Sequence, residues 1–203
     1  MKPLHAFFSL DKQPRIPWKN GAGLTQELAT WPPETNTDAW EMRVSVAEFA
    51  IDVPFSVFPG IDRHMTLLSD AGLTLDSQTF ETEVFTARLS HRWQSIRFKG
   101  ELALRATLHG QVVSVLNVMT KRSLCTSRVE IHHDAFQLDG IGNGMLLNLQ
   151  GQSACKGQVQ DTPLQFLLGP NEGLWWACHP RTARCQVIPS SGACVCIVFE
   201  ALA

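Results

Sequence analysis

This sequence lacks the usual marks of a membrane or nucleic-acid-binding protein. No apolar run is long enough to cross a bilayer as a helix. The first residues, MKPLHAFFSLDKQ, hold a short apolar stretch that His5 and Ser9 interrupt, unlike a signal peptide. No basic run appears, and the formal net charge is −2. We therefore expect a cytoplasmic protein with no nucleic-acid partner and no membrane partner.

Motifs for metal binding and covalent catalysis are also missing. His64 has no histidine two residues away, and the adjacent His132 and His133 would point to opposite faces of a strand. There is no Gly-x-Ser-x-Gly motif, and Cys178 and His179 are neighbours in sequence, which says nothing about their geometry. No phosphate loop or dinucleotide glycine pattern is present. We expect neither a metal site nor a cofactor.

The six cysteines all lie in the second half of the chain and include no Cys-x-x-Cys pair. In a reducing compartment they are expected to be thiols. Cys194 and Cys196 alternate within ACVCIVF, as two side chains on one face of a strand would. We interpret them as small buried hydrophobic residues.

A period of two residues is strongly present. In WEMRVSVAE, residues 40–48, apolar side chains alternate with polar ones that include Arg43 and Ser45. VVSVLNVM, residues 112–119, is nearly all apolar, which is typical of a strand covered on both faces. Clusters of Pro, Gly, Asp and Asn separate the segments, which predicts an all-β sandwich or barrel without convincing helices. Further short strands are predicted over FSVF, HMTLL, LTLD, GMLLNLQG, LQFLLGP and ACVCIVFE.

Two interpretations of the polar strand faces stay open. In an open sheet Arg43 and Ser45 face water, as most charged residues do. In a closed barrel they point into the lumen, where polar groups usually contact a ligand. Arg63 follows the Pro59-Gly60 turn and is suited to bind a carboxylate by its guanidinium fork. The alternative is a surface arginine paired with Asp62 or another acid.

The stretch WKNGAGLTQEL, residues 18–28, combines a turn signal with the start of a strand. Asn20-Gly21 favours a tight turn, and glycine also lets backbone N–H groups approach a ligand. The glycines precede a strand and not a helix, so they do not form a dinucleotide-binding loop. On the following strand Thr25 and Glu27 share a face.

Together these stretches resemble the HutD/Ves family of cupin-fold proteins. WKNGAGLTQEL is similar to Trp-x-Asn-Gly-Gly-Gly-x-Thr-x-Glu, and WEMRVSVAEF with PFSVFPGIDRHMTLL is similar to Trp-Arg-x-Ser and Phe-Ser-x-Phe-Pro-Gly-x-x-Arg. FKGELALRATLHGQVVSVLNVMTKR is similar to Phe-x-Gly-Glu and Asn-x-Met-x-Arg. The blocks cover the first two-thirds of the chain. There are departures, because Ala22 replaces a glycine, Val115 an acid and Lys121 an arginine.

The resemblance implies an RmlC-like bicupin, in which one chain forms two β-barrels without the usual metal-binding histidines. We expect the N-terminal barrel, with a ligand pocket, at residues 1–120. A smaller C-terminal barrel is expected at residues 121–203, with exchange of strands between the two allowed. The boundary falls near the polar stretch Thr120–Arg128.

The resemblance and the shared strand faces together suggest one polar pocket in the N-terminal barrel. Its expected ligand-binding residues are Asn20, Thr25, Glu27, Arg43, Ser45, Arg63 and Asn117. For Glu27 the structural alternative is a salt bridge to Arg43 or Arg63.

The family implies a small carboxylate metabolite such as formylglutamate, a link to histidine utilisation and no established catalytic activity. Our first hypothesis is therefore a non-catalytic binder acting in regulation, with a homodimer allowed. The second is a metal-independent isomerase or hydrolase with Glu27 as general base. The third is a stress-linked structural protein that works through a protein partner.

Overall fold

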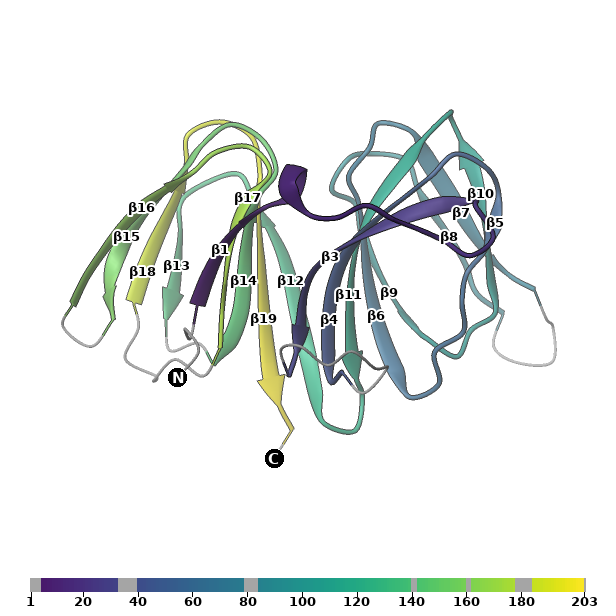
Figure 1. Ribbon diagram of the computed structural model, residues 1–203, viewed down its shortest axis with the longest axis horizontal. Helices are drawn as coiled ribbons and strands as arrows, with labels where there is room; N and C mark the ends of the chain where they lie inside the picture. Colours follow the sequence, from purple (N-terminus) through teal and green to yellow (C-terminus); the bar gives the residue numbers. More distant parts are fainter. Residues whose placement is uncertain are drawn as a thin grey trace. The chain divides into compact units, whose positions relative to one another are not determined.

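The protein is built almost entirely of β-strands. The computed structural model describes residues 5–32, 40–78, 84–139, 142–159, 162–177 and 184–202. These ranges contain nineteen strands and one 3-10 turn, Leu10–Lys12, so the all-β prediction is confirmed (Figure 1). Within the same ranges, no helix has the length and apolar character needed to cross a membrane.

The chain divides into two compact units. The N-terminal unit holds residues 14–126 together with 202–203, and the C-terminal unit holds residues 127–201 together with 1–13. The expected boundary assigned residues 1–13 to the N-terminal barrel. The same expectation allowed strands to be exchanged between the two units. β1 (His5–Ser9) hydrogen bonds along β17 (Glu172–Trp176), and Figure 1 shows the purple β1 beside β17.

Two antiparallel sheets form the N-terminal unit. The six-stranded sheet has the order β2 (Ile16–Pro17), β3 (Gly23–Trp31), β4 (Met42–Phe49), β11 (Val113–Lys121), β6 (Ile61–Leu67) and β9 (Ser95–Lys99). The four-stranded sheet has the order β5 (Val53–Pro54), β10 (Leu104–His109), β7 (Gly72–Ser77) and β8 (Thr86–Leu89). One apolar cluster contains Met65 and Leu67 from the first sheet and Leu73 and Leu75 from the second, so the two sheets pack face to face.

The C-terminal unit repeats this plan. Its five-stranded sheet has the order β1, β17, β14 (Asn143–Asn148), β19 (Cys194–Ala201) and β12 (Cys125–His132). Its four-stranded sheet has the order β13 (Phe136–Asp139), β18 (Arg184–Pro189), β15 (Ser153–Val159) and β16 (Thr162–Leu168). Leu146 and Cys196 from one sheet share an apolar cluster with Cys155 and Val187 from the other.

In each unit the two sheets are separate hydrogen-bonded ladders. No strand pairing within the described residues joins one sheet to its partner. The structure thus shows two pairs of facing sheets, and the finer prediction of two closed barrels is not shown by it.

Sequence alternation accounts for most of the N-terminal core. β11 is buried on both faces, as predicted: Val113 and Val115 lie in the apolar cluster, and Leu116 and Val118 on the opposite face are no more than 1% exposed. The strand predicted over FSVF is wrong. Residues 55–58 form a loop between β5 and β6, which two backbone hydrogen bonds hold at its ends.

Candidate functional site

A cavity of about 510 Å³ lies within the N-terminal unit, on the inner face of its six-stranded sheet. The turn before β3 and the loop after β5 complete its walls. The structure brings all seven residues expected from the sequence to this one cavity, namely Asn20, Thr25, Glu27, Arg43, Ser45, Arg63 and Asn117. They come from one turn and four different strands.

Strand register explains how residues far apart in sequence meet here. Glu27, Ser45 and Asn117 are direct partners across β3, β4 and β11. Arg43 of β4 and Arg63 of β6 both pair with Met119, two residues beyond Asn117 on β11. Paired residues point to the same side of a sheet, so all five face the cavity. The solvent-face interpretation is therefore wrong for Ser45, which is 4% exposed, and for the partly buried Arg43.

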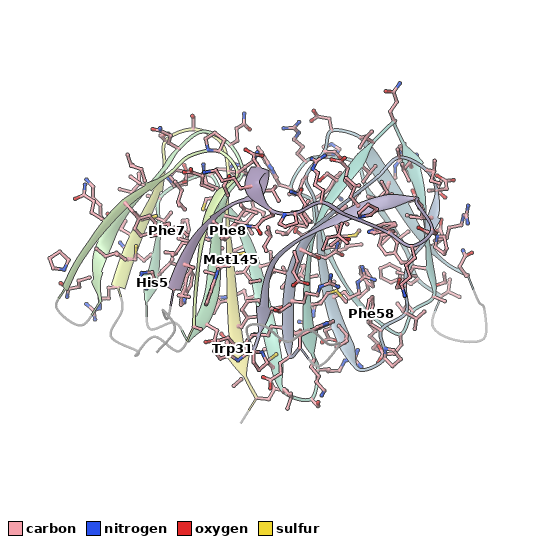
Figure 2. The ribbon with its side chains drawn as sticks, in the orientation of Figure 1. His5, Phe7, Phe8, Trp31, Phe58 and Met145 are labelled. Carbon is pink, nitrogen blue, oxygen red and sulfur yellow. The ribbon has the colours of Figure 1, made fainter. Side chains whose placement is uncertain are left out.

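Arg63 is the buried cation of the cavity. Its side chain is 7% exposed and lies among three aromatic rings. The guanidinium carbon is 5.1 Å from the ring centre of Phe55, 5.7 Å from that of Phe58 and 5.0 Å from that of Phe98. Phe58 is marked in Figure 2. The ring faces favour a cation, but they supply no negative charge to balance it.

The polar contacts of Arg63 are few and neutral. Nη2 donates to Oδ1 of Asn117 at 3.0 Å, and Nη1 donates to the carbonyl oxygen of Ser56 at 3.4 Å. Nε is buried without a hydrogen-bond partner, and no acid pairs with Arg63 within the described ranges. Burial, and then the charge of Arg43, lower the pKa of Arg63 to about 10. The guanidinium is therefore an electrostatically unsatisfied group.

Asp62, the acid next to Arg63, faces the other way. Its Oδ2 accepts from Arg97 at 2.9 Å and its Oδ1 accepts from Arg122 at 2.6 Å. Successive residues of a strand point to opposite faces, so Asp62 cannot neutralise Arg63. The alternative interpretation of Arg63 as a surface arginine paired with Asp62 is wrong.

Glu27 and Arg43 form an ion pair at the more open side of the cavity. Nε of Arg43 donates to Oε2 of Glu27 at 2.9 Å. The register of β3 against β4 shifts between Glu27 and Ala29, so a β-bulge lies beside this pair. The salt-bridge interpretation of Glu27 is confirmed for Arg43 as the partner. The same contact orients the Arg43 fork along the cavity wall.

The glycine-containing stretch before β3 is a hairpin turn. Oδ1 of Asn20 accepts from the backbone N–H of Ala22 at 3.1 Å, and Gly21 has φ of +69°. Gly23 tolerates no side chain, since a Cβ there would lie 2.6 Å from the carbonyl oxygen of Glu48. The turn thus uses the oxygen of Asn20 and leaves its amide nitrogen for the cavity.

Thr25 is also held by a neighbour in this turn. The indole Nε1 of Trp18 donates to Oγ1 of Thr25 at 2.7 Å. Because indole is a donor only, Thr25 keeps its hydroxyl hydrogen and can donate it into the cavity.

A second group of charges, outside the cavity, holds the loop that carries Phe58. Both guanidinium nitrogens Nη1 and Nη2 of Arg122 donate to Glu101, at 2.8 and 2.9 Å. Glu101 also accepts from the backbone N–H of Gly60 at 3.0 Å, and Gly60 accepts from the backbone N–H of Arg122. The hydrogen bonds from Arg122 lower the pKa of Glu101 to about 2. We call this arrangement, formed by Gly60, Glu101 and Arg122, the loop clamp.

Sequence reasoning missed the loop clamp and the apolar wall of the cavity. The family motif that contains Glu101 predicts no role for this residue. The motif also indicates position 121, but Lys121 does not line the cavity and Arg122 forms the clamp. The apolar wall consists of Ile16, Pro17, Trp18, Ala47, Phe49, Pro54, Phe55, Phe58, Val115 and Met119. Phe55 and Phe58, which lie shortly before Arg63 in the sequence, could have predicted an aromatic wall beside this arginine.

Metal ligation has no support in the described part of the chain, where no group of three or more His, Cys, Asp or Glu side chains is arranged to hold an ion. His64 points away from Arg63, and burial, followed by the charge of Arg97, lowers the pKa of its imidazole. The neighbours Cys178 and His179 lie outside the described residues.

Comparisons with known proteins agree with this structure. Protein Ves of Citrobacter koseri is 35% identical over 179 residues, 88% of this chain and 86% of that protein. Protein Ves of Cronobacter sakazakii is 32% identical over 179 residues, 88% of this chain and 90% of that protein.

Solved structures share the fold. A conserved protein of unknown function from Pseudomonas aeruginosa PAO1 gives a TM-score of 0.80 at 22% identity, covering 98% of this chain and all of that chain. HutD from Pseudomonas fluorescens SBW25 in a formate condition gives 0.78 at 18% identity, with the same coverage. Oxalate decarboxylase from Lactobacillus farciminis, a cupin in a formate complex, gives 0.64 at 6% identity over 97% of this chain and 88% of that one. Residues 10–195 match the HutD family model, so the chain belongs to the HutD family.

Proposed function

We propose that the cavity of the N-terminal unit binds a small molecule whose carboxylate pairs with Arg63. The observation that carries this proposal is the buried guanidinium, whose Nε has no partner and which no acid within the described residues neutralises. A carboxylate accepts two parallel N–H bonds from such a fork, and partial burial strengthens that pair relative to water.

The other charges of the cavity favour the same class of ligand. Arg43, Arg63 and Lys19 line it against one acid, Glu27, which Arg43 already binds. An anion would relieve the repulsion between the two arginines that contributes to the lowered pKa of Arg63.

The neutral polar groups supply a way to read the rest of the ligand. Asn20, Thr25 and Ser45 line the wall and can donate to or accept from an amide or formyl group. The volume of about 510 Å³ is typical of small-molecule sites. A formylglutamate-like acid, taken up by a bicupin barrel, fits these features.

We place this binding in the regulation of histidine utilisation and regard it as non-catalytic. Glu27, the general base of the enzymatic alternative, has one carboxylate oxygen occupied by Arg43 at 2.9 Å. Its contact supports a role in positioning Arg43. Membership in the HutD family supports the regulatory setting.

Isothermal titration calorimetry and thermal unfolding with formate, formylglutamate and imidazole-pathway acids test the proposal. Ligand at one hundred times its dissociation constant should stabilise the fold by about 2.7 kcal/mol. Arg63→Ala removes a charged hydrogen bond of about 1.5–3 kcal/mol and should abolish most of that shift. Arg105→Ala is the matched control, because Arg105 is exposed on β10 and does not line the cavity.

Binding that survives both Arg63→Ala and Arg43→Ala would contradict the proposed site. If the acids bind and are converted, at a rate that falls in Glu27→Gln while affinity holds, the enzymatic alternative replaces the binder. If no acid binds, the proposed ligand class is wrong.

A further inference from the structure

Among the described residues, four thiols gather in the interior of the C-terminal unit. Cys155 on β15 and Cys185 on β18 come from the four-stranded sheet, and Cys194 and Cys196 on β19 come from the facing sheet. All four belong to, or pack against, one apolar cluster. They differ in access, because Cys185 is partly exposed whereas the other three are at most 1% exposed.

Cys155 and Cys185 are close neighbours on one face of the sheet. The register of β15 against β18 places Gly157 opposite Cys185, and Cys155 is two residues from Gly157. A Cβ at Gly157 would lie 2.7 Å from the Cα of Cys185, so the missing side chain lets the strands approach closely and leaves Cys185 beside Cys155. Cys155 and Cys185 are thus diagonal neighbours across this strand pair, and each thiol shifts the pKa of the other.

The surroundings make the two thiols unequal. The S–H of Cys155 and the backbone N–H of Lys156 favour the thiolate of Cys185, and together they lower its pKa despite partial burial. The contact with Cys185 and burial raise the pKa of Cys155. Thiolate character combined with access determines which thiol reacts first. Cys185 is therefore the thiol expected to attack an oxidant first, and Cys155 is the resolving thiol.

We infer that Cys185 and Cys155 form a site of reversible oxidation by hydroperoxides. The sulfur of Cys185 attacks one peroxide oxygen, so that an S–O bond forms, the O–O bond breaks, and an alcohol or water leaves after taking a proton. Cys155 then attacks the sulfenic sulfur, an S–S bond forms, and water leaves. Two thiols and one hydroperoxide give one disulfide, one water and one alcohol, or a second water when the oxidant is hydrogen peroxide.

The facing thiols do not share this chemistry. Burial raises the pKa of Cys194 and of Cys196 to about 12 each. They remain protonated at neutral pH and have no access to an oxidant, so they are expected to be inert. The site is distinct from the cavity of the N-terminal unit and does not depend on the ligand proposed for it.

Peptide mass spectrometry of the full chain treated with hydrogen peroxide tests the inference. Every sample carries Cys178→Ser, so that the remaining thiols are those of Cys125, Cys155, Cys185, Cys194 and Cys196. We expect a Cys155–Cys185 disulfide with the loss of two hydrogens. Cys155→Ser should instead stop at a sulfenic acid on Cys185 that dimedone traps. Cys185→Ser should slow thiol loss by about tenfold or more, since the remaining thiols are buried.

Cys196→Ser is the matched control and should oxidise at the parent rate. Circular dichroism melts establish that each variant is folded. Should a variant fail to fold, the order of iodoacetamide labelling in the parent protein decides, and Cys185 should be labelled first. A parent protein that forms no Cys155–Cys185 disulfide, or that labels Cys125 or Cys194 before Cys185, overturns the inference.

Discussion

The two units share a plan of facing sheets and differ in what occupies the space between them. In the C-terminal unit Leu146, Leu168 and the buried thiols meet across the interior. In the N-terminal unit part of the equivalent space is a cavity of about 510 Å³ lined by arginine, asparagine and serine. One architecture therefore accepts a packed core or a polar hollow, and the inward residues of the strands decide which one forms.

One buried polar residue from each unit makes the difference concrete. Asn148 in the C-terminal unit donates from Nδ2 to the carbonyl oxygens of Gly151 and Gly169, and its Oδ1 accepts from Ser153. Arg63 in the N-terminal unit leaves Nε without a partner. A buried polar group whose hydrogen bonds are all made stabilises the fold, whereas one with an unmade hydrogen bond can still bind a ligand.

The C-terminal unit does have a hollow, but it lies at the surface. A groove of about 500 Å³ runs by β1 and the end of β16, and its Phe7 and Leu167 are 55% and 64% exposed. Phe7 and Phe8 of β1 are marked in Figure 2. Such a groove is open to water, so it creates no buried unpaired charge.

The largest expected effect tests the packed interior. Leu146→Ala removes a side chain that is 1% exposed in the C-terminal cluster, and it should lower the free energy of unfolding by about 2–5 kcal/mol. Urea unfolding measures the change. A loss below about 1 kcal/mol would show that this interior relaxes around a void and is not close-packed.

Enlarging a small inward residue in each unit comes next. Cys194→Leu overfills the packed interior and should cost about 1–3 kcal/mol. Ala47→Leu extends into the cavity and should cost less than about 1 kcal/mol, while weakening any ligand. Equal costs in chemical unfolding would remove the contrast between the two interiors.

Replacing the unpaired cation gives a smaller effect of opposite sign. Arg63→Met keeps much of the volume and removes a buried charge, so the ligand-free protein should gain about 1 kcal/mol of unfolding free energy. The same variant should lose carboxylate binding. Thermal unfolding without and with formylglutamate measures the stability of the variant and its loss of ligand binding. If the ligand-free variant is strongly destabilised, Arg63 has a structural role and is not an unsatisfied charge.

The smallest effect belongs to the loop clamp in acid. The pKa of Glu101 is about 2 in the folded protein, below its ordinary value near 4.5. Ionised Glu101 therefore adds to the free energy of unfolding at pH values above 4.5, and this stabilisation is lost as the pH falls towards 2. The group is partly exposed, so the contribution should be below about 1 kcal/mol. Glu101→Gln should flatten urea stability between about pH 5 and pH 2. An unchanged slope would contradict the clamp.

The sequence predicts the inward residues well because a strand alternates with a fixed period. Thr25 with Glu27, and Arg43 with Ser45, share faces whatever the register turns out to be. Bringing Asn117 and Arg63 to the same cavity depended on the family resemblance, since pairing between distant strands leaves no local pattern. For the same reason the sequence does not decide whether Arg63 binds a carboxylate ligand or pairs with Asp62 at the surface. The structure decides, because Asp62 lies on the opposite face of the strand.

Other features had no local signal. β1 pairs with β17, which is far away in the sequence, and nothing in the stretch HAFFS predicts this partner. The bidentate contact between Arg122 and Glu101 spans 21 residues, and charge alone does not select this pair among several acids and bases. Tertiary geometry decides both.

The membership of residues 1–13 in the C-terminal unit sets an order of events during synthesis. β1 leaves the ribosome well before its partner, Glu172–Trp176. Strands β2 to β11 have all their sheet partners among themselves and can fold while translation continues. During synthesis β1, which carries Phe7 and Phe8, cannot form its hydrogen bonds until β17 has been made. The C-terminal unit therefore completes its five-stranded sheet only after residues 14–126 have left the ribosome.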